Sequence, residues 1–153
     1  MTIDIRPDDL SGAATRALVS THVNGMRANT PEESCHVLDL DGLVGGGATM
    51  WSAWVDGELA GIGALAPLDD ERAELKSMRV ADAFLGRGIG RAMLRHLIDE
   101  ARARGIRSLW LETGSGDDFV AARRLYASEG FVECAAFGSY APDPLSTFMT
   151  RGI

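Results

Sequence analysis

The chain has 153 residues, of which 46% are hydrophobic and 24% are charged, proportions typical of a globular protein rather than a disordered one. Its formal net charge of −7 argues against a nucleic-acid partner, because nucleic-acid-binding proteins gain much of their affinity by neutralising phosphates. No apolar run approaches the roughly 20 residues that a membrane-spanning helix needs, so we expect a cytoplasmic protein without a membrane partner.

The first third of the chain predicts a strand, a helix and a long loop. Residues 2–6 alternate in polarity, as a short strand does. A helical pattern opens at Pro7 and stops before Pro31, because a proline disfavours a helical conformation in the residue that precedes it. Residues 32–47 combine polar side chains with a glycine run, which is typical of a loop. The expected apolar face of the helix comprises Leu10, Ala14, Ala17, Leu18 and Thr21.

The middle of the chain predicts three consecutive strands. Residues 49–55 and 58–68 flank the dipeptide Asp56-Gly57, which is a strong signal for a two-residue hairpin turn. A third alternating stretch over residues 71–80 follows after a short connection. Short connections join antiparallel neighbours, so we expect these three strands to pair antiparallel.

From residue 88 the hydrophobic period changes from two to that of a helix. The pattern predicts a helix over residues 88–104, which Gly105 closes. The apolar stripe of this helix comprises Ile89, Met93, Leu94, Leu97, Ile98 and Ala101. The remaining expected elements are a strand over 108–112, a helix over 117–130 and strands over 131–137 and 145–151.

The order of these elements, β-α-β-β-β-α-β-α-β-β, defines the fold class. Hairpins come first and helical crossovers later, which favours a mixed central sheet of about six to seven strands, antiparallel in its first half. Helices are expected on both faces of this sheet, in one α/β (α+β) domain over residues 1–153. A Rossmann fold would need strands and helices that alternate from the start, and this chain does not alternate.

A glycine-rich loop over residues 85–91 follows the strand that ends at Val80. Its three glycines let the backbone turn sharply and present N–H groups outward at the start of a helix. Such N–H groups and the helix dipole together form an anion site suited to a phosphate, and Arg87 and Arg91 add positive charge. Between residues 72 and 107, nine Lys and Arg residues outnumber four Asp and Glu residues, which favours a small polyanionic ligand.

Two familiar nucleotide motifs fail on spacing in this loop. A Walker loop requires Lys-Ser/Thr after its last glycine, and the Rossmann fingerprint would require glycine at position 91, where this chain has arginine. A glycine-rich turn that binds no ligand stays open as the alternative.

Two segments resemble the signatures of the GCN5-related N-acetyltransferases. Gly86-Arg87-Gly88-Ile89-Gly90-Arg91-Ala92 resembles the pyrophosphate-binding loop of that family, and Leu125-Tyr126-Ala127-Ser128-Glu129-Gly130-Phe131 resembles its second signature. The element order is similar too, so the resemblance covers essentially the whole chain. Relatives usually carry Arg or Gln at the position of Leu85 and often Asn at the position of Phe119. The first departure removes one polar contact near the phosphate, and the second replaces a side chain that could hydrogen-bond the cofactor arm.

The resemblance implies an N-acetyltransferase that moves the acetyl group of acetyl-coenzyme A (acetyl-CoA) onto a primary amine by direct attack in a ternary complex. The alternative is a catalytically silent acyl-CoA sensor on the same fold. No metal is expected, since the three histidines show no metal-ligand spacing. The pantetheine arm would pair with strand backbone, the diphosphate would lie on loop amides, and an N–H near Val80 would polarise the thioester. The implied cofactor-binding residues are Met78, Val80, Leu85, Gly86, Arg87, Gly88, Ile89, Gly90 and Arg91.

Three side chains are candidates for proton transfer. Tyr126 lies where relatives place the tyrosine that serves the leaving sulfur; the alternative is a core tyrosine on an apolar helix face. Glu74 lies where some relatives carry a glutamate base, acting directly or through water; the alternative is a solvent-facing strand carboxylate. Glu112 is the second candidate for the base and could equally bind the charge of the amine.

The acceptor pocket of the family is usually built from the first helix, the loop after it and the final hairpin. The substrate residues that this implies are Glu33, His36, Glu112 and Tyr140, and His22 also belongs to these regions. His36 could instead be surface decoration. Acidic residues there favour a cationic acceptor, either a small molecule or a protein amine. Dimers are common in such enzymes, so a homodimer is one assembly to test.

Overall fold

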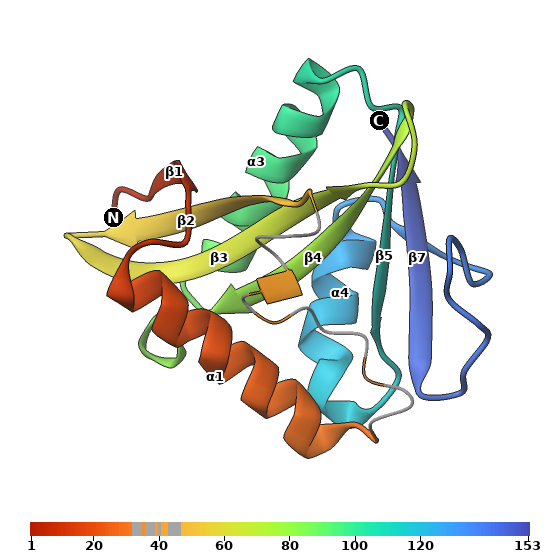
Figure 1. Cartoon of the computed structure of the whole chain (residues 1–153), viewed down its shortest axis with the longest axis horizontal. Helices are drawn as coiled ribbons and strands as arrows, with labels where there is room; N and C mark the ends of the chain where they lie inside the picture. Colours follow the sequence, from red (N-terminus) through yellow and green to blue (C-terminus); the bar gives the residue numbers. More distant parts are fainter. Residues whose placement is uncertain (32–34, 36–38, 40, 43–46) are drawn as a thin grey trace.

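The computed structural model describes residues 1–31, 35, 39, 41–42 and 47–153, and its elements follow the expected order (Figure 1). Two short 3₁₀ turns, η2 (Asp82–Phe84) and η3 (Asp117–Phe119), precede the second and third of the helices named below. The strands are β1 (Asp4–Asp8), β2 (Thr49–Val55), β3 (Glu58–Pro67), β4 (Arg72–Val80), β5 (Ser108–Gly114), β6 (Val132–Cys134) and β7 (Ser146–Gly152). The helices are α1 (Ala13–Asn29), α3 (Ile89–Ala103) and α4 (Val120–Ser128).

The strands form one seven-stranded mixed sheet in the order β1-β2-β3-β4-β5-β7-β6. Among the described strands, only β4 and β5 pair in parallel, and the other neighbouring pairs are antiparallel. The predicted hairpin between β2 and β3 is confirmed. Its two turn residues, Asp56 and Gly57, both have positive φ (50° and 79°), which is the conformation of a type I′ turn.

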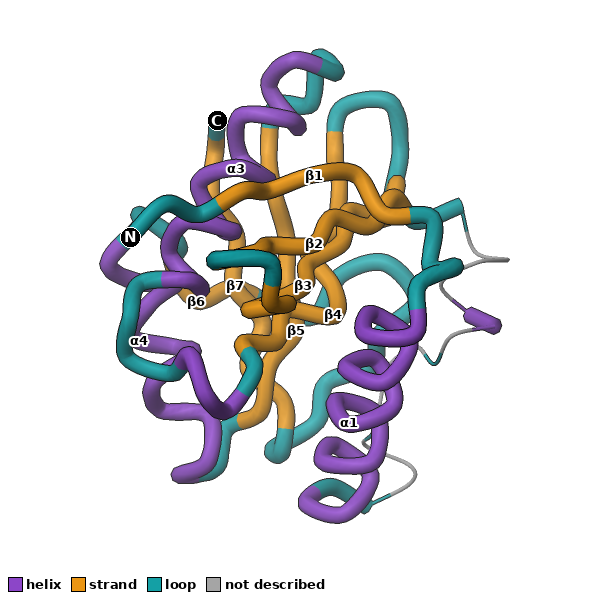
Figure 2. Tube along the Cα trace, turned by 90° about the vertical axis from the view of Figure 1, so that its left-hand side faces the viewer, coloured by secondary structure: helices purple, strands orange, loops and turns teal. Residues whose placement is uncertain are grey.

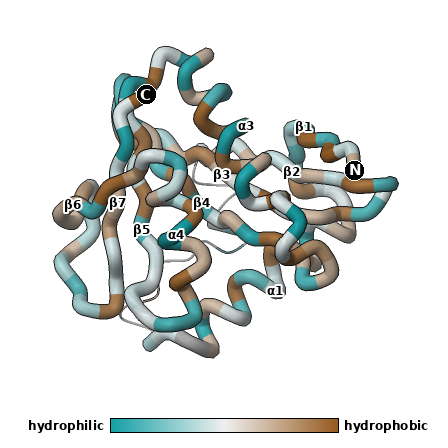
Figure 3. The backbone as a smooth tube through the Cα atoms, turned by 180° about the vertical axis from the view of Figure 1, so that it is seen from behind, coloured by the Kyte–Doolittle hydropathy of each residue, from teal (hydrophilic) through white to brown (hydrophobic). Residues whose placement is uncertain are grey.

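Helices cover both faces of the sheet, as predicted. Figure 2 shows α1 on one side of the strands and α3 with α4 on the other. The two faces bury separate cores because side chains alternate along each strand: Met50 of β2 packs toward α1, and its neighbour Trp51 packs toward α3. The predicted apolar stripe of α3 is buried over its whole length, and its amphipathic pattern appears as alternating brown and teal in Figure 3.

The predicted apolar face of α1 is wrong in part. Ala14, Ala17 and Thr21 are exposed. The helix starts at Ala13 rather than at Pro7, because Asp8 stays in β1 and organises the turn that follows. Its carboxylate accepts hydrogen bonds from the N–H of Leu10 (2.8 Å) and the hydroxyl of Thr15 (2.8 Å). The face that this turn directs at the sheet consists of Thr15, Leu18, Val19, His22 and Val23. Among the described helices, none is long and apolar enough to cross a membrane.

Candidate active site

A gap opens in the middle of the sheet, where β4 and β5 part. The two strands pair at only three positions, from Arg72 opposite Ser108 to Glu74 opposite Trp110. Beyond that point β4 continues to Val80 and β5 to Gly114 without pairing to each other. Figure 1 shows the two strands meeting at one end and separating toward α1. The divergence exposes the edge of β4, the strand backbone with which the family resemblance pairs the pantetheine arm.

Side chains from five elements line the gap. From α1 come His22 and Met26, and from η3 and α4 come Phe119, Ala122 and Tyr126. The two strands contribute Glu74, Lys76, Ser77, Met78, Glu112 and Thr113. The two candidate carboxylates and the candidate tyrosine therefore line the same gap, although they lie up to 52 positions apart in the chain.

A bulge in β4 determines which of its side chains face the α1 side of the sheet and which face the α3 side. Ile62 pairs with Arg79 and Ala64 with Lys76, so three residues of β4 span the length of two in β3. Inside this bulge Ser77 adopts a left-handed conformation with φ of 55°, which is uncommon for a residue other than glycine. As a result the alternation shifts by one residue, and Met78 and Val80 pack on the α3 side of the sheet.

The main chain of β4 beyond the bulge presents N–H groups to the gap. The N–H of Ala81 donates to the carbonyl of Ala60 in β3 (2.8 Å). Successive N–H groups of a strand point to opposite edges, so the N–H of Val80, and that of Met78 two residues earlier, point away from β3 and toward the gap. This orientation is the one that pairing with an extended pantetheine arm requires.

The glycine loop joins β4 to α3 and supplies main-chain N–H groups that have no partner within the helix. Gly86 and Gly88 have φ of 75° and 82°, and a Cβ at either position would meet open space, so glycine is required there by conformation rather than by packing. The first bond into α3 runs from the N–H of Ala92 to the carbonyl of Gly88 (3.0 Å), which leaves the N–H groups of residues 89–91 ahead of the helix ladder. Loop and helix terminus thus provide the donors and the open space that a diphosphate needs.

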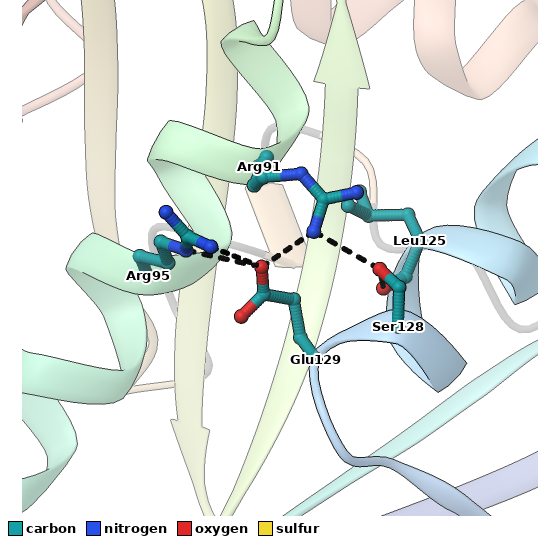
Figure 4. Close-up of polar contacts among 5 residues, drawn as sticks. All are labelled: Arg91, Arg95, Leu125, Ser128 and Glu129. Atoms are coloured by element: carbon teal, nitrogen blue, oxygen red, sulfur yellow. Dashed lines mark hydrogen bonds and ion pairs between the residues drawn. The ribbon is translucent and has the colours of Figure 1, made fainter.

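The arginines around this loop differ in their contacts. Arg91 donates to the carboxylate of Glu129 (2.5 Å) and to the hydroxyl of Ser128 (3.0 Å), and Arg95 donates to the same carboxylate (3.0 Å) (Figure 4). These bonds, first of all the one from Arg91, hold the pKa of the Glu129 carboxyl below its usual value. Arg91 therefore ties α3 to α4, and a contact with phosphate stays a prediction. Arg87 packs its guanidinium over the ring of Phe84 (5.4 Å), and Leu85 is 63% exposed.

Tyr126 lies on the α4 side of the gap. Its side chain is 7% exposed and packs edge-on against Phe131, with ring centroids 5.8 Å apart. Burial raises the pKa of its hydroxyl to about 12, so the phenol keeps its proton at neutral pH. It is part of the core and also lines the gap, which makes it available as a proton donor.

Glu74 does not face solvent. It is 7% exposed, accepts a hydrogen bond from the hydroxyl of Tyr140 (2.5 Å) and pairs with the ammonium of Lys76 (3.2 Å). Tyr140 comes from the loop between β6 and β7, where its ring packs against Phe137 (5.2 Å) and Phe148 (5.6 Å). Burial, and then the Glu74 carboxylate, raise the pKa of the Tyr140 hydroxyl well above its usual value.

Glu112 is the second carboxylate of the gap and lies on β5. It accepts a hydrogen bond from the hydroxyl of Ser146 (2.7 Å), at the start of β7. The predicted acceptor residues Glu112 and Tyr140 therefore both belong to the polar cluster around Glu74. The other two, Glu33 and His36, lie outside the described residues.

Two further features of the gap were not predicted. Lys76 and Ser77 looked like ordinary strand residues, because neither the bulge nor the parting of the strands leaves a local signature in the sequence. Phe119, where relatives often carry Asn, lies directly over Gly114, and any larger residue at 114 would clash with its ring. No group of three or more His, Cys, Asp or Glu side chains suited to a metal exists within the described part of the chain.

Comparison with known proteins gives a consistent result. Residues 19–131 match the model of the acetyltransferase (GNAT) family. The chain is 46% identical to the uncharacterized N-acetyltransferase YsnE of Bacillus subtilis, over 97% of this chain and 99% of that protein. A Klebsiella pneumoniae structure, proposed to be an acyl-CoA N-acyltransferase, superposes with a TM-score of 0.82 at 28% identity, covering 99% of this chain and 97% of that one. A GNAT acetyltransferase from Elizabethkingia anophelis with acetyl-CoA bound superposes with a TM-score of 0.74 at 20% identity, covering 99% and 98%.

Proposed function

This chain belongs to the acetyltransferase (GNAT) family of N-acetyltransferases, and from that premise we propose that it transfers an acetyl group from acetyl-CoA to a primary amine by direct attack in a ternary complex. The observation that carries the proposal is the gap between β4 and β5. It has loop and strand N–H groups at its border and holds Tyr126 with two carboxylates in its lining.

The residues that would hold acetyl-CoA are those of the loop and of β4. The N–H groups of residues 86–91 would bind the diphosphate, and the N–H groups of Met78 and Val80 would bind the extended arm. Bound there, acetyl-CoA supplies an activated thioester. The Elizabethkingia neighbour of the same fold, which holds acetyl-CoA, supports this assignment.

The acceptor amine must lose a proton before it can attack. An alkyl amine with a pKa near 10.4 is neutral in only about one molecule in a few thousand at pH 7. Glu74 is the proposed base, directly or through a water molecule, because it lines the gap and is held in place by Tyr140 and Lys76. Glu112, across the gap on β5, is positioned to bind the charge of the incoming amine and is the second candidate for the base.

The departing sulfur must gain a proton or a hydrogen bond. Tyr126 is the proposed donor, because burial raises its pKa to about 12 and keeps the hydroxyl protonated until charge develops beside it. A cationic group at this place would serve less well, since the same burial would disfavour its charged form.

Two measurements test the proposal. Acetyl-CoA should raise the melting temperature of the protein, whereas ATP and NAD should not. Thiol release from acetyl-CoA should then exceed background hydrolysis with at least one member of a library of amines and amine-bearing peptides. A protein that acetyl-CoA stabilises but that releases no thiol with any acceptor would be the silent acyl-CoA sensor instead.

A further inference from the structure

Two buried polar groups on the α1 side of the gap lack partners. Among the described residues three buried side-chain atoms make no hydrogen bond: Nδ1 of His22, Oγ of Ser77 and Nε2 of His96. His22 and Ser77, each only 9% exposed, both line the gap, although they come from α1 and β4. A buried polar group without a partner is costly, and two of them in one pocket indicate a place for a polar group of a ligand.

A positive charge lies near His22. The guanidinium of Arg79 lies against α1, with Nη1 3.5 Å from where a Cβ on Gly25 would stand, one turn beyond His22. No described carboxylate forms a salt bridge with Arg79. Its charge, second to burial, lowers the pKa of His22 to about 4, so the imidazole is neutral at pH 7 and has a single N–H to donate.

The opposite charge gathers at the other end of the same space. Glu74 lies at the fork at which β4 and β5 part, three residues along β4 from Ser77, and Glu112 lies two residues beyond the last paired residue of β5. A ligand that spans the pocket therefore meets the two carboxylates and Lys76, which is paired with Glu74, at the fork. Toward the end of β4 it meets a hydroxyl and a neutral imidazole, with the guanidinium of Arg79 near the imidazole.

From this juxtaposition we propose that the acceptor is a small amine that also carries a carboxylate, the chemistry of an amino acid, with its carboxylate bound by His22, Ser77 and Arg79. Two neutral donors and one guanidinium match one negative charge, whereas a phosphate dianion would call for more cations. The inference rests on the proposed acetyl transfer and names the substrate class for it. It refines the expectation of a cationic acceptor, because the amine end keeps its place near the carboxylates.

The test compares three acceptors that differ in one group. An amino acid, its primary amide and the corresponding decarboxylated amine are assayed for thiol release from acetyl-CoA, and their binding is measured by calorimetry in the presence of coenzyme A. Across a panel of side chains we expect the best amino acid to exceed its amide and its amine by about 10- to 100-fold in kcat/KM and in affinity. Amides or simple amines that perform as well as, or better than, every amino acid would overturn the inference.

The two proposals fail differently in this experiment. Turnover of amines without any preference for a carboxylate would reject the proposed substrate class and leave the proposed acetyl transfer standing. Selective binding of amino acids without thiol release would reject the proposed acetyl transfer and leave the proposed carboxylate site standing.

Variants tie the preference to the named residues. Arg79→Met should remove the preference of the acid over the amide, with KM for acetyl-CoA unchanged within about twofold. Ser77→Gly should weaken acid binding about tenfold and fold normally, because glycine adopts a φ of 55° without strain. The matched control is His96→Phe, which removes the third of the buried groups that make no hydrogen bond; its imidazole packs on Trp51 away from the gap. If Arg79→Met and Ser77→Gly keep the wild-type preference, or if His96→Phe abolishes it, the assignment of the carboxylate site is wrong.

Discussion

The two sides of the gap between β4 and β5 differ in whether main-chain or side-chain groups line them. The proposed cofactor side consists of main chain: the strand edge at Met78 and Val80 and the loop amides between Gly86 and Arg91. The acceptor side consists of side chains from α1, β4, β5 and the loop before β7, joined by hydrogen bonds such as that from Tyr140 to Glu74.

This difference explains why sequence motifs predict the main-chain side and do not predict the side-chain side. A main-chain site needs residues with positive φ, and glycines at fixed spacing in the sequence mark those residues. A side-chain site needs only the right groups at one place in space, and the chain positions that supply them are set by the fold. The following predictions test this division, from the largest expected effect to the smallest.

The largest effect is expected at Glu74, the proposed base on the acceptor side. Glu74→Gln keeps the size of the side chain and can still accept a hydrogen bond from Tyr140, but it cannot take a proton, so kcat/KM should fall about 100- to 10,000-fold. Glu133→Gln, on the exposed face of β6, is the control and should be fully active. The pH profile decides the assignment: if Glu74→Gln keeps the acidic limb of turnover and a normal rate, the base is another group, and Glu112→Gln becomes the next variant to measure.

His22 should make stability depend on pH within a defined window. Its pKa is about 4 in the folded protein and about 6.5 when unfolded, so between these values the unfolded chain binds a proton that the folded chain does not. The free energy of unfolding should therefore fall by about 3 kcal/mol as the pH drops from 6.5 to 4. The charges around His22 are Arg79, Glu74, Lys76 and Glu112.

Denaturant titrations at several pH values measure this slope. His22→Gln should flatten it, whereas His96→Gln should keep it. An unchanged slope in the His22 variant would show that the imidazole is already protonated or solvated in the folded protein.

Tyr126 lines the gap, and its proposed role is to protonate the departing sulfur. Tyr126→Phe removes only the hydroxyl and keeps the packing on Phe131, so we expect kcat to fall about 10- to 100-fold. The affinity for acetyl-CoA should stay within about twofold, as isothermal titration can determine. Full activity with a good acceptor would remove the donor role and leave Tyr126 as a core residue.

The two ends of α3 offer a direct test of the main-chain site. Gly88 and Gly105 have almost equal φ (82° and 79°) and open space around the Cβ position, so alanine at either should cost about 1–2 kcal/mol of stability. Only Gly88→Ala should also weaken acetyl-CoA binding, about tenfold, because its strain distorts the loop amides. Equal affinities of the two variants for acetyl-CoA would mean that the loop does not hold the diphosphate.

The smallest effect is expected at the contact between α3 and α4 shown in Figure 4. Arg91→Gln and Glu129→Gln should each lower the free energy of unfolding by about 0.5–1 kcal/mol, since the pair lies near the surface. If Arg91 also contacts phosphate, as its place in the loop predicts, Arg91→Gln alone should weaken acetyl-CoA binding a few-fold. Equal affinities of both variants would restrict Arg91 to holding the helices together.

Much of the fold follows from local patterns in the sequence. The Asp56-Gly57 hairpin, the stripe of α3 and the closing Gly105 were all predicted, because turn angles and helical periodicity depend on neighbouring residues. The face of α1 was predicted wrongly in part, because the start of the helix depends on hydrogen bonds between Asp8 and residues that follow it rather than on apolar spacing.

The candidate site divides in the same way. By itself the sequence determined the order of the elements and the donor-rich loop before α3, since both depend on residues adjacent in the chain. Tertiary structure alone decided the parting of β4 from β5, the left-handed Ser77 in its bulge, and the contact of Tyr140 with Glu74 across 66 positions. Such contacts form only when packed layers bring distant segments together, and so they leave no period or spacing in the chain.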